Sequence, residues 1–377
     1  MVLNHVVHLS FSEMSSQWLF ETLFKILLKV VYVLNIVPMP DQQVNITYCL
    51  KTFIYFASYT FLLVTSVQYE YNFNYGLSKT EIFNICIAIT SVILSYLILM
   101  LILYSYLRNS LWQCFYQKVG KFEYGQVNEI LSFRNITLLL FFIFEVVGVL
   151  VMAHYIFIIY EQTHQSAYRT ILAVSCPCIS FCYQICQWTV MLLFIKNIRE
   201  QVEKSEKHLD LKQLNVKMAK HLFLEARLLS VLFNRIFGYQ LLATFGQWIL
   251  FILEVGIQSD IILNPEKFNA HFESPISVFF VSLSGRIAAT AFGPCSIAFA
   301  CDLVTLETEK LLNSCYQLQE EFDCKSHEYQ QLQSFGSYIS NNGIRFTAAE
   351  FFEIKRSTIL SVIATSTTYF VALVQFF

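Results

Sequence analysis

The side chain with the clearest chemical potential is an uncharged amide, Gln375, near the end of an apolar run that begins near Ile359. The run is long enough to cross a bilayer, where an amide is unfavourable unless it meets a partner or water. On a helix of 3.6 residues per turn, Thr368, Ala372 and Gln375 lie on or near one face. This face predicts a helix side turned toward a protein interior or an aqueous path. An amide bonded to another helix of the same subunit is the alternative.

A second set of polar and aromatic residues lies inside the other apolar runs. Aromatic walls with a few placed polar groups suit a small organic ligand, although 36 Phe and 21 Tyr make any cavity here aromatic. For each residue alone, a structural contact is the more frequent role, and an ion pair between Glu254 and Arg286 would satisfy two costly charges. Glu145 is expected to be a buried, hydrogen-bonded residue. The ligand-pocket candidates are His154, Tyr155, Gln247, Trp248, Glu254, Ser284 and Arg286.

Other common chemistries have no pattern in the sequence. The 11 Cys residues are scattered, mostly in apolar runs, and predict neither a disulfide framework nor a four-ligand zinc site. Within residues 176–178, Cys-Pro-Cys predicts a helix kink, with a metal site as a remote alternative. No HExxH, G-x-S-x-G or P-loop pattern occurs. We therefore expect no enzyme activity, no metal and no cofactor.

The composition indicates a membrane protein. Of 377 residues, 56% are hydrophobic and only 14% are charged, whereas a soluble domain carries roughly 25% charged residues. No basic tail or arginine-rich run indicates nucleic acid as a partner. Residues 1–20 lack the basic start, apolar core and cleavage site of a signal peptide, so none is expected.

Apolar stretches of about 20 residues predict an all-α fold, a bundle of seven transmembrane helices. A further apolar stretch, Trp18–Val37, is interrupted by charges and followed by Pro38, which indicates an interfacial or re-entrant helix. The predicted spans are Tyr48–Val67, Ile82–Leu107, Ile136–Tyr160, Thr170–Ile195, Ile236–Ile257, Ile276–Val304 and Thr358–Phe377.

The positive charges predict the orientation. Of the 25 Lys and Arg residues, 21 lie before the first span or after the second, fourth and sixth spans. The excess of positive charge on the cytoplasmic side predicts a cytoplasmic N-terminus and an extracellular C-terminus. This is opposite to a G-protein-coupled receptor. The sequons at Asn45 and Asn135 would then stay unglycosylated.

The two longest connections, 197–235 and 305–355, would be cytoplasmic and helical. Leu311, Cys315, Leu318 and Phe322 are spaced four, three and four apart, like one face of a helix, and neither connection contains Pro. These helices would pack against their own bundle or against another subunit. We expect one domain over residues 1–377, with spans one to six at about 48–304, a cytoplasmic helical region at about 305–357 and the last helix at about 358–377.

The C-terminus also resembles a known family. Thr368-Tyr369, five apolar residues and Gln375-Phe376 are similar to the C-terminal signature of insect gustatory receptors, which are related to insect odorant receptors. The segment Phe346–Arg356 is similar to the one that joins the two halves of the family's last helix, although Glu350 stands where a small residue is expected. The resemblance implies a tetrameric, ligand-gated cation channel with the last helix lining the pore.

Specific roles follow from the resemblance. Gln375 and Phe376 would form the constriction, and Thr368 would face the pore. Related odorant receptors often carry a larger aliphatic gate residue where this chain has Ala372, so Phe376 is the expected gate. An amide ring without carboxylates indicates non-selective cation passage. The sugar-sensing branch tends to carry an acidic residue directly after Thr-Tyr; Phe370 here favours a bitter compound or another small organic tastant.

The sequence thus predicts a multi-pass receptor of the plasma membrane of a sensory neuron. Its partners would be a small-molecule tastant, identical or related subunits in a tetramer, and membrane lipid, with no nucleic acid. Two alternatives come from other classes. A G-protein-coupled receptor would need the opposite orientation, and a secondary transporter would show matching broken segments in two halves of the chain.

Overall fold

The computed structural model describes residues 167–209, 214–263 and 276–376, together with single helical turns between residues 54 and 114. The predictions for residues 1–47, for the span at 136–160 and for both sequons lie outside the described residues. The described elements are α7 (Ala167–Lys207), α8 (Val216–Leu263), α9 (Ile276–Glu320), α10 (His327–Asn341), β1 (Thr347–Ala348), β2 (Phe352–Glu353) and α11 (Arg356–Phe376).

Three long helices dominate the described part, and each changes character along its length. The predicted fourth, fifth and sixth apolar stretches lie within α7, α8 and α9, which continue for about three to five and a half turns beyond them into charged sequence. The connections expected to be helical are therefore continuations of these helices, followed by α10. By length and composition, one described helix, α8 over Val216–Leu253, is apolar enough to cross a membrane.

Local sequence signals explain where the helices begin and end. The Asn215 side chain accepts a hydrogen bond from the Met218 amide at 3.0 Å before α8, and Ser326 does the same for Tyr329 at 3.1 Å before α10. Such caps satisfy amides that have no partner within the helix. Lys204 and Lys207 lie in the last turn of α7, where positive charge complements the helix dipole.

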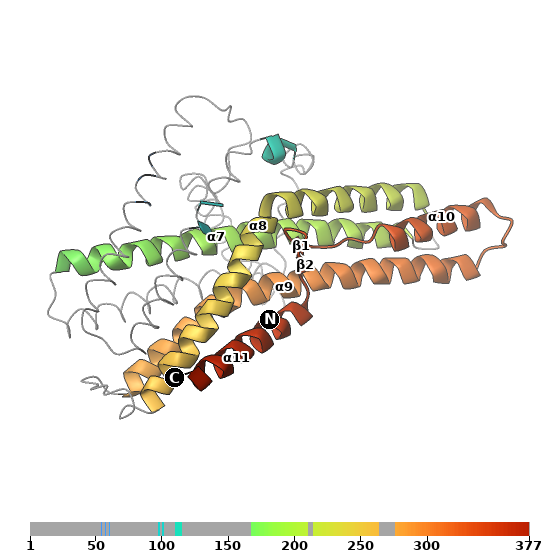
Figure 1. Cartoon of the computed structure of the whole chain (residues 1–377). Helices are drawn as coiled ribbons and strands as arrows, with labels where there is room; N and C mark the ends of the chain where they lie inside the picture. The colour runs from blue at the N-terminus through green and yellow to red at the C-terminus, as the bar shows by residue number, and fades with distance from the viewer. Residues whose placement is uncertain are drawn as a thin grey trace, which may run out of the picture.

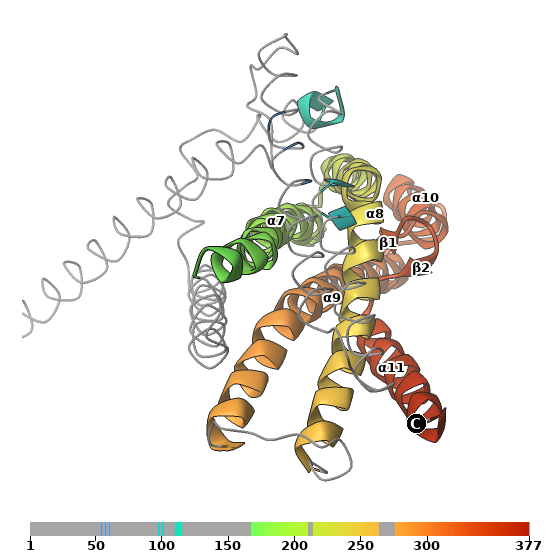
Figure 2. The ribbon, with the colours of Figure 1, turned by 60° about the vertical axis from the view of Figure 1, so that its left-hand side comes forward.

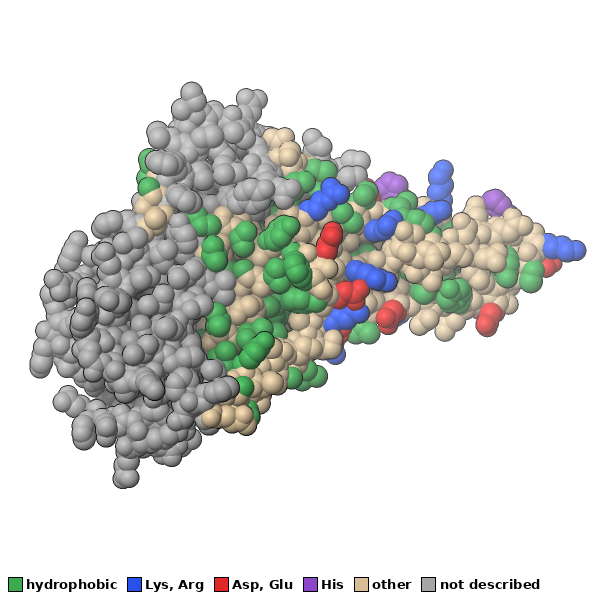
Figure 3. All heavy atoms as spheres, viewed as in Figure 1, with side chains coloured by type: hydrophobic (Ala, Val, Ile, Leu, Met, Phe, Trp, Pro, Cys, Tyr) green, Lys and Arg blue, Asp and Glu red, His purple; other side chains and the backbone are tan. Residues whose placement is uncertain are grey.

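The charged and apolar halves of α8 and α9 point in different directions, whereas α7 runs straight (Figure 1). Figure 1 shows α10 lying along the charged halves of α8 and α9, and α8 changing direction near its middle. Beyond that point α8, α9 and α11 diverge, with α11 beside α8 (Figure 2). Lys, Arg, Asp and Glu side chains gather over the α10 end on the face shown in Figure 3.

Aromatic rings fill the core where the charged and apolar halves meet. Phe233 of α8 lies 5.6 Å from Phe194 of α7, 5.1 Å from Phe237 and 5.3 Å from Phe346, measured between ring centroids. Phe346 precedes β1, so this core also fixes the chain that leads into the two strands. The predicted stripe on α9 is buried as well: Leu311 and Cys315 are fully buried in the same core, which includes residues of α10.

Ion pairs join the charged halves. Arg199 of α7 donates to Glu307 of α9 at 2.8 Å, and Lys310 of α9 donates to Glu206 of α7 at 3.1 Å. The hydrogen bond and charge of Glu206 raise the pKa of Lys310, with Glu307 contributing further. Within the described part, these helices therefore pack against their own bundle.

Candidate functional site

One side of α11 packs against the bundle and the rest of it is exposed. Val362 and Ser366, four residues apart, are buried. The positions predicted to share the opposite face are open: Thr368 and Gln375 are exposed, and Ala372 is half-buried. The structure therefore places these three predicted residues on a side of α11 that its own subunit leaves largely uncovered.

Several hydroxyl groups of α11 are hydrogen-bonded within the helix, whereas the Gln375 side-chain amide has no hydrogen bond to the described residues. The hydroxyls of Ser361, Thr367 and Thr368 donate to backbone carbonyls four residues earlier, at 2.8–3.1 Å. Such back-bonding lets hydroxyls remain on an apolar helix without water. Gln375, in contrast, makes no hydrogen bond within the described residues. The alternative of an amide bonded to a neighbouring helix thus finds no support in the described part. The Phe376 side chain lies outside it.

A close contact seats α11 on α8. A Cβ atom built on Gly256 of α8 would lie 2.8 and 2.9 Å from two ring carbons of Phe370. Real Cβ contacts are essentially never that short, so only glycine allows this approach. Gly256 of α8 and Phe370 of α11 are therefore in close contact.

The first turn of α11 is fixed to both α9 and β2. Arg356 pairs with Asp302 of α9 at 2.8 Å and lies over the Phe299 ring, 5.2 Å from its centroid. The Thr358 hydroxyl accepts from the Lys355 amide at 3.0 Å and donates to the Glu353 carbonyl at 2.9 Å. These contacts fix where α11 begins.

A strained hairpin leads into α11. Strands β1 and β2 pair antiparallel, and the turn between them places Ala349 and Glu350 at φ 50° and 66°. This left-handed conformation favours glycine, which explains why a small residue was expected at Glu350. Asn234 of α8 holds the turn by donating to the Arg345 carbonyl at 2.9 Å and accepting from the Thr347 amide at 3.0 Å.

A second polar cluster lies between the apolar halves of α7 and α8. Gln184 donates to Gln247 at 3.1 Å, and Gln187 donates to Gln240. Gln240 in turn donates to the Leu101 carbonyl at 3.1 Å. Sequence reasoning selected only Gln247 of these residues. Gln184, Gln187 and Gln240 could have been selected on the same ground as Gln247, because each is a glutamine inside or beside an apolar stretch.

Among the predicted ligand-pocket residues, the structure describes two side chains. Gln247 is half-buried, and the adjacent Trp248 is buried, with its ring 6.4 Å from that of Phe245. Glu254, Ser284 and Arg286 lie on α8 and α9, but their side chains are outside the described residues, as is the proposed ion pair. His154, Tyr155 and Glu145 are outside them altogether. The Cys-Pro-Cys triplet lies within helical sequence of α7.

In the described part, no group of three or more His, Cys, Asp or Glu side chains could hold a metal ion. The described side chains on the open face of α11 and in the glutamine cluster are amides, hydroxyls and aromatic rings. Such groups bind and orient neutral molecules or partly hydrated ions by hydrogen bonds and dipoles.

Two solved structures share the fold of this chain. The insect olfactory receptor OR5 from Machilis hrabei superposes with a TM-score of 0.64 at 11% identity, covering 95% of this chain and 100% of that chain. The same receptor in complex with eugenol gives a TM-score of 0.60 at 12% identity, with the same coverage. The predicted all-α fold of seven transmembrane helices is thus confirmed. No curated protein sequence matches this chain.

The family assignment comes from the sequence. The pattern of the 7tm chemosensory receptors matches residues 24–376, nearly the whole chain. This family consists of membrane receptors rather than enzymes, and it confirms the resemblance seen in the C-terminal signature. The chain belongs to the 7tm chemosensory receptor family.

Proposed function

We propose that this receptor is a gustatory receptor that works as a ligand-gated, non-selective cation channel. Four subunits, identical or related, would surround a central pore lined by α11 in the plasma membrane of a sensory neuron. The N-terminus would be cytoplasmic and the C-terminus extracellular. Residues 305–357 would form the cytoplasmic region beneath spans one to six, and residues 358–377 the pore helix.

The observation that carries this proposal is the exposed face of α11. Thr368 and Gln375 lie on a side that the described part of the subunit leaves open, and Gln375 has no hydrogen bond there. An unpaired amide is costly against lipid, whereas a water-filled path shared by four copies would hydrate it. Gln375 would then line the constriction, and Phe376 would close it by excluding water. Ala372 is too small to do so.

The ligand would bind among the apolar halves of the helices. Gln247 and Trp248 provide an amide beside a buried aromatic ring, the combination that suits a small organic molecule. OR5 binds eugenol, a small organic compound, which supports this ligand class. Phe370 after Thr-Tyr favours a bitter compound over a sugar. His154, Tyr155, Glu254, Ser284 and Arg286 remain candidates for the same pocket.

Gating requires that the ligand bind the open state more tightly than the closed one, because equal affinity shifts no equilibrium. The Gly256–Phe370 contact gives a direct route for this coupling. A ligand that moves the apolar half of α8 would move the outer part of α11 with it. The base of α11, held by Asp302 and the hairpin, would stay in place.

The test is electrophysiological. The chain is expressed alone, screened against a panel of tastants, and compared with Gln375→Ala and with Gln333→Ala, which removes an exposed amide on α10. We expect altered ion permeability and pore block in Gln375→Ala alone. Unchanged permeability and block in that variant, with robust wild-type currents, would remove Gln375 from the conduction path. A silent chain would be tested again together with related subunits.

A further inference from the structure

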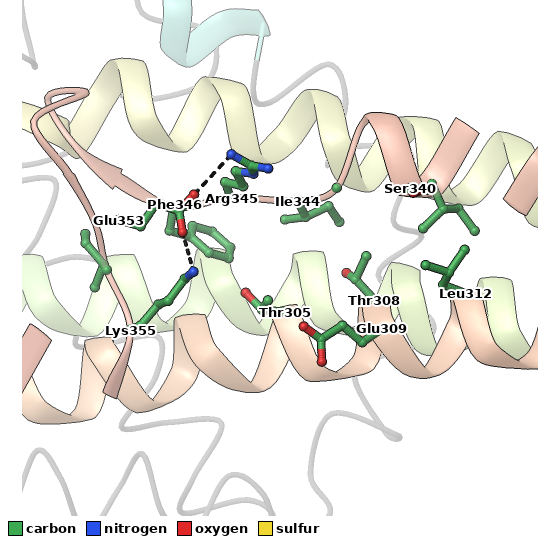
Figure 4. Close-up of a pocket in the computed structure, with 13 residues that line it drawn as sticks. Thr305, Thr308, Glu309, Leu312, Ser340, Ile344, Arg345, Phe346, Glu353 and Lys355 are labelled. Atoms are coloured by element: carbon green, nitrogen blue, oxygen red, sulfur yellow. Dashed lines mark ion pairs between the residues drawn. The ribbon is translucent and has the colours of Figure 1, made fainter. Parts of the chain in front are cut away.

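A cavity of about 290 Å³ lies away from the proposed pore and ligand pocket. It is a half-open hollow lined by α9, the end of α10, the segment that precedes β1, Glu353 of β2, and the chain between β2 and α11 (Figure 4). Ile344, Phe346 and Ile354 form buried apolar parts of its wall. The lining also includes four charged side chains: Glu309 on α9, and Arg345, Glu353 and Lys355, which lie together (Figure 4). The cavity therefore offers charged partners beside apolar surface.

Positive charge is in excess at one end of the cavity. The Glu353 carboxylate pairs with both Arg345, at 3.3 Å, and Lys355 (Figure 4). One carboxylate thus compensates two cations. The Arg345 side chain is 73% exposed and that of Lys355 45% exposed. Each cation therefore retains donors that a further anionic group could bind.

Acceptors line the α9 side of the cavity. Glu309 is exposed and makes no ion pair or hydrogen bond among the described residues. The neighbouring hydroxyls of Thr305 and Thr308 donate to the carbonyls of Cys301 and Val304, at 3.3 and 2.9 Å. Their proton is engaged in the helix, so they offer lone pairs to the cavity. This side is suited to a group that donates several hydrogen bonds and carries positive charge.

We propose that this cavity binds a phosphoethanolamine group, a phosphate joined to a primary ammonium by two carbons. The phosphate would accept from Arg345 and Lys355, since guanidinium and phosphate are geometrically matched. The ammonium would donate to Glu309 and to the two threonine hydroxyls. The four lining charges sum to zero, which favours a zwitterion over a bare anion or cation. The volume lies at the lower end of the range for small-molecule sites, as this small group requires.

The position of the cavity in the fold indicates a lipid as one source of this group. The cavity lies where the apolar stretch of α9 ends, near Val304, and where that of α11 starts, near Thr358. Arg356 beside it covers the partly exposed Phe299 ring, an arrangement suited to a membrane surface. The other source of the same chemistry is soluble glycerophosphoethanolamine, whose phosphate is a diester like that of the lipid. Binding of either does not depend on channel activity.

The experiment uses the full-length chain, purified and reconstituted with defined lipids. Native mass spectrometry would count retained phosphatidylethanolamine and, in parallel, phosphatidylcholine, which has the same phosphate but no N–H donors. We expect preferential retention of phosphatidylethanolamine. We also expect that Glu309→Gln weakens it about fivefold, as for loss of one ion pair of about 1 kcal/mol. Glu328→Gln, an exposed acid on α10 outside the cavity, is the matched control and should change nothing.

A soluble arm separates the two sources. Glycerophosphoethanolamine is added at millimolar concentration to protein in detergent, and the melting temperature is recorded for wild type, Glu309→Gln, Glu309→Ala and Glu328→Gln. In one outcome the soluble compound raises the melting temperature of wild type but not of the two Glu309 variants, while the two lipids are retained equally. This outcome would support the site, with the soluble compound as its ligand. Equal retention of both lipids together with no effect of the free compound would overturn the proposal. Unchanged behaviour of both Glu309 variants would overturn it as well.

Discussion

The indole of Trp188 on α7 covers the backbone of Gly293 on α9 so closely that a Cβ atom at residue 293 would overlap its six-membered ring. Both residues are buried. Pro294 follows directly and removes a backbone donor from the middle of α9. A helix position with a weakened hydrogen-bond ladder thus lies under a large, rigid side chain.

Replacing this glycine should disturb the packing of the two helices. Gly293→Ala requires the indole or α9 to move, and overpacking of this kind costs about 1–3 kcal/mol. We expect a lower melting temperature of the purified protein. Gly336→Ala on α10 is the control, because its Cβ would meet neighbours at ordinary distances of 3.5–3.7 Å. If Trp188→Phe restored the melting temperature of Gly293→Ala, the indole would be identified as the obstacle. An undisturbed Gly293→Ala protein would contradict the contact.

The glutamine pair between α7 and α8 should behave as a unit. Gln187→Leu leaves the buried amide of Gln240 without one of its partners, and an unsatisfied buried polar group costs about 1–3 kcal/mol. Replacing both by Leu should cost less than the sum of the single changes. A double-mutant cycle on thermal stability measures this coupling, expected at about 0.5–2 kcal/mol. Strict additivity would show that the two amides do not interact.

Asn234 should control the order of the hairpin. Asn234→Ala removes two hydrogen bonds to the backbone around β1, so we expect faster amide exchange over residues 345–353. The expected loss of stability is about 1–3 kcal/mol. Asn341→Ala, an exposed residue at the end of α10, is the control. Exchange rates that match the control would mean that close packing against Gly238 alone holds the turn. A Cβ atom added to Gly238 would lie 2.9 Å from the Ala349 amide nitrogen.

Cys315 and Cys324, both in the charged region, should differ in their reactivity toward a thiol reagent. Burial raises the pKa of Cys315 to about 12, whereas Cys324 is exposed. At pH 8, iodoacetamide followed by peptide mass spectrometry should modify Cys324 and leave Cys315 unmodified until the protein unfolds. Because the folded pKa of Cys315 is the higher one, its contribution to stability is intact below pH 9.0 and is lost as pH rises toward 12. Rapid modification of Cys315 in folded protein would contradict its burial.

Sequence patterns predicted what depends on local periodicity. Of the predicted stripe, Leu311, Cys315 and Leu318 are buried on α9, whereas Phe322 lies half-buried just beyond the end of this helix. Charged sequence beyond the apolar stretches of α7 and α9 continues as helix. The resemblance of residues 346–356 marked the connection to the last helix, and the left-handed turn explains why Glu350 looked out of place.

What could not be predicted depends on how separate helices meet. Gln187 and Gln240 are 53 residues apart, and whether they pair depends on the rotation of α7 against α8. The same holds for Gly293, since glycines are common in membrane helices and only the fold reveals the indole above this one. Asn234 carries no signal of its own, because an amide near the junction of charged and apolar sequence is ordinary. Its partners are backbone groups more than 100 residues away.

The double attachment of the last helix has a practical consequence for engineering. Asn234 and Gly238 on α8 contact the turn at 347–351, and Asp302 on α9 forms an ion pair with Arg356. The position of the terminal segment therefore depends on side chains of α8 and α9. A chimera that exchanges only residues 358–377 between relatives would keep these two attachments, and its residue 370 must still fit against Gly256. One that exchanges residues 346–377 must bring compatible side chains at 234, 238 and 302, or the transplanted segment will start from the wrong place.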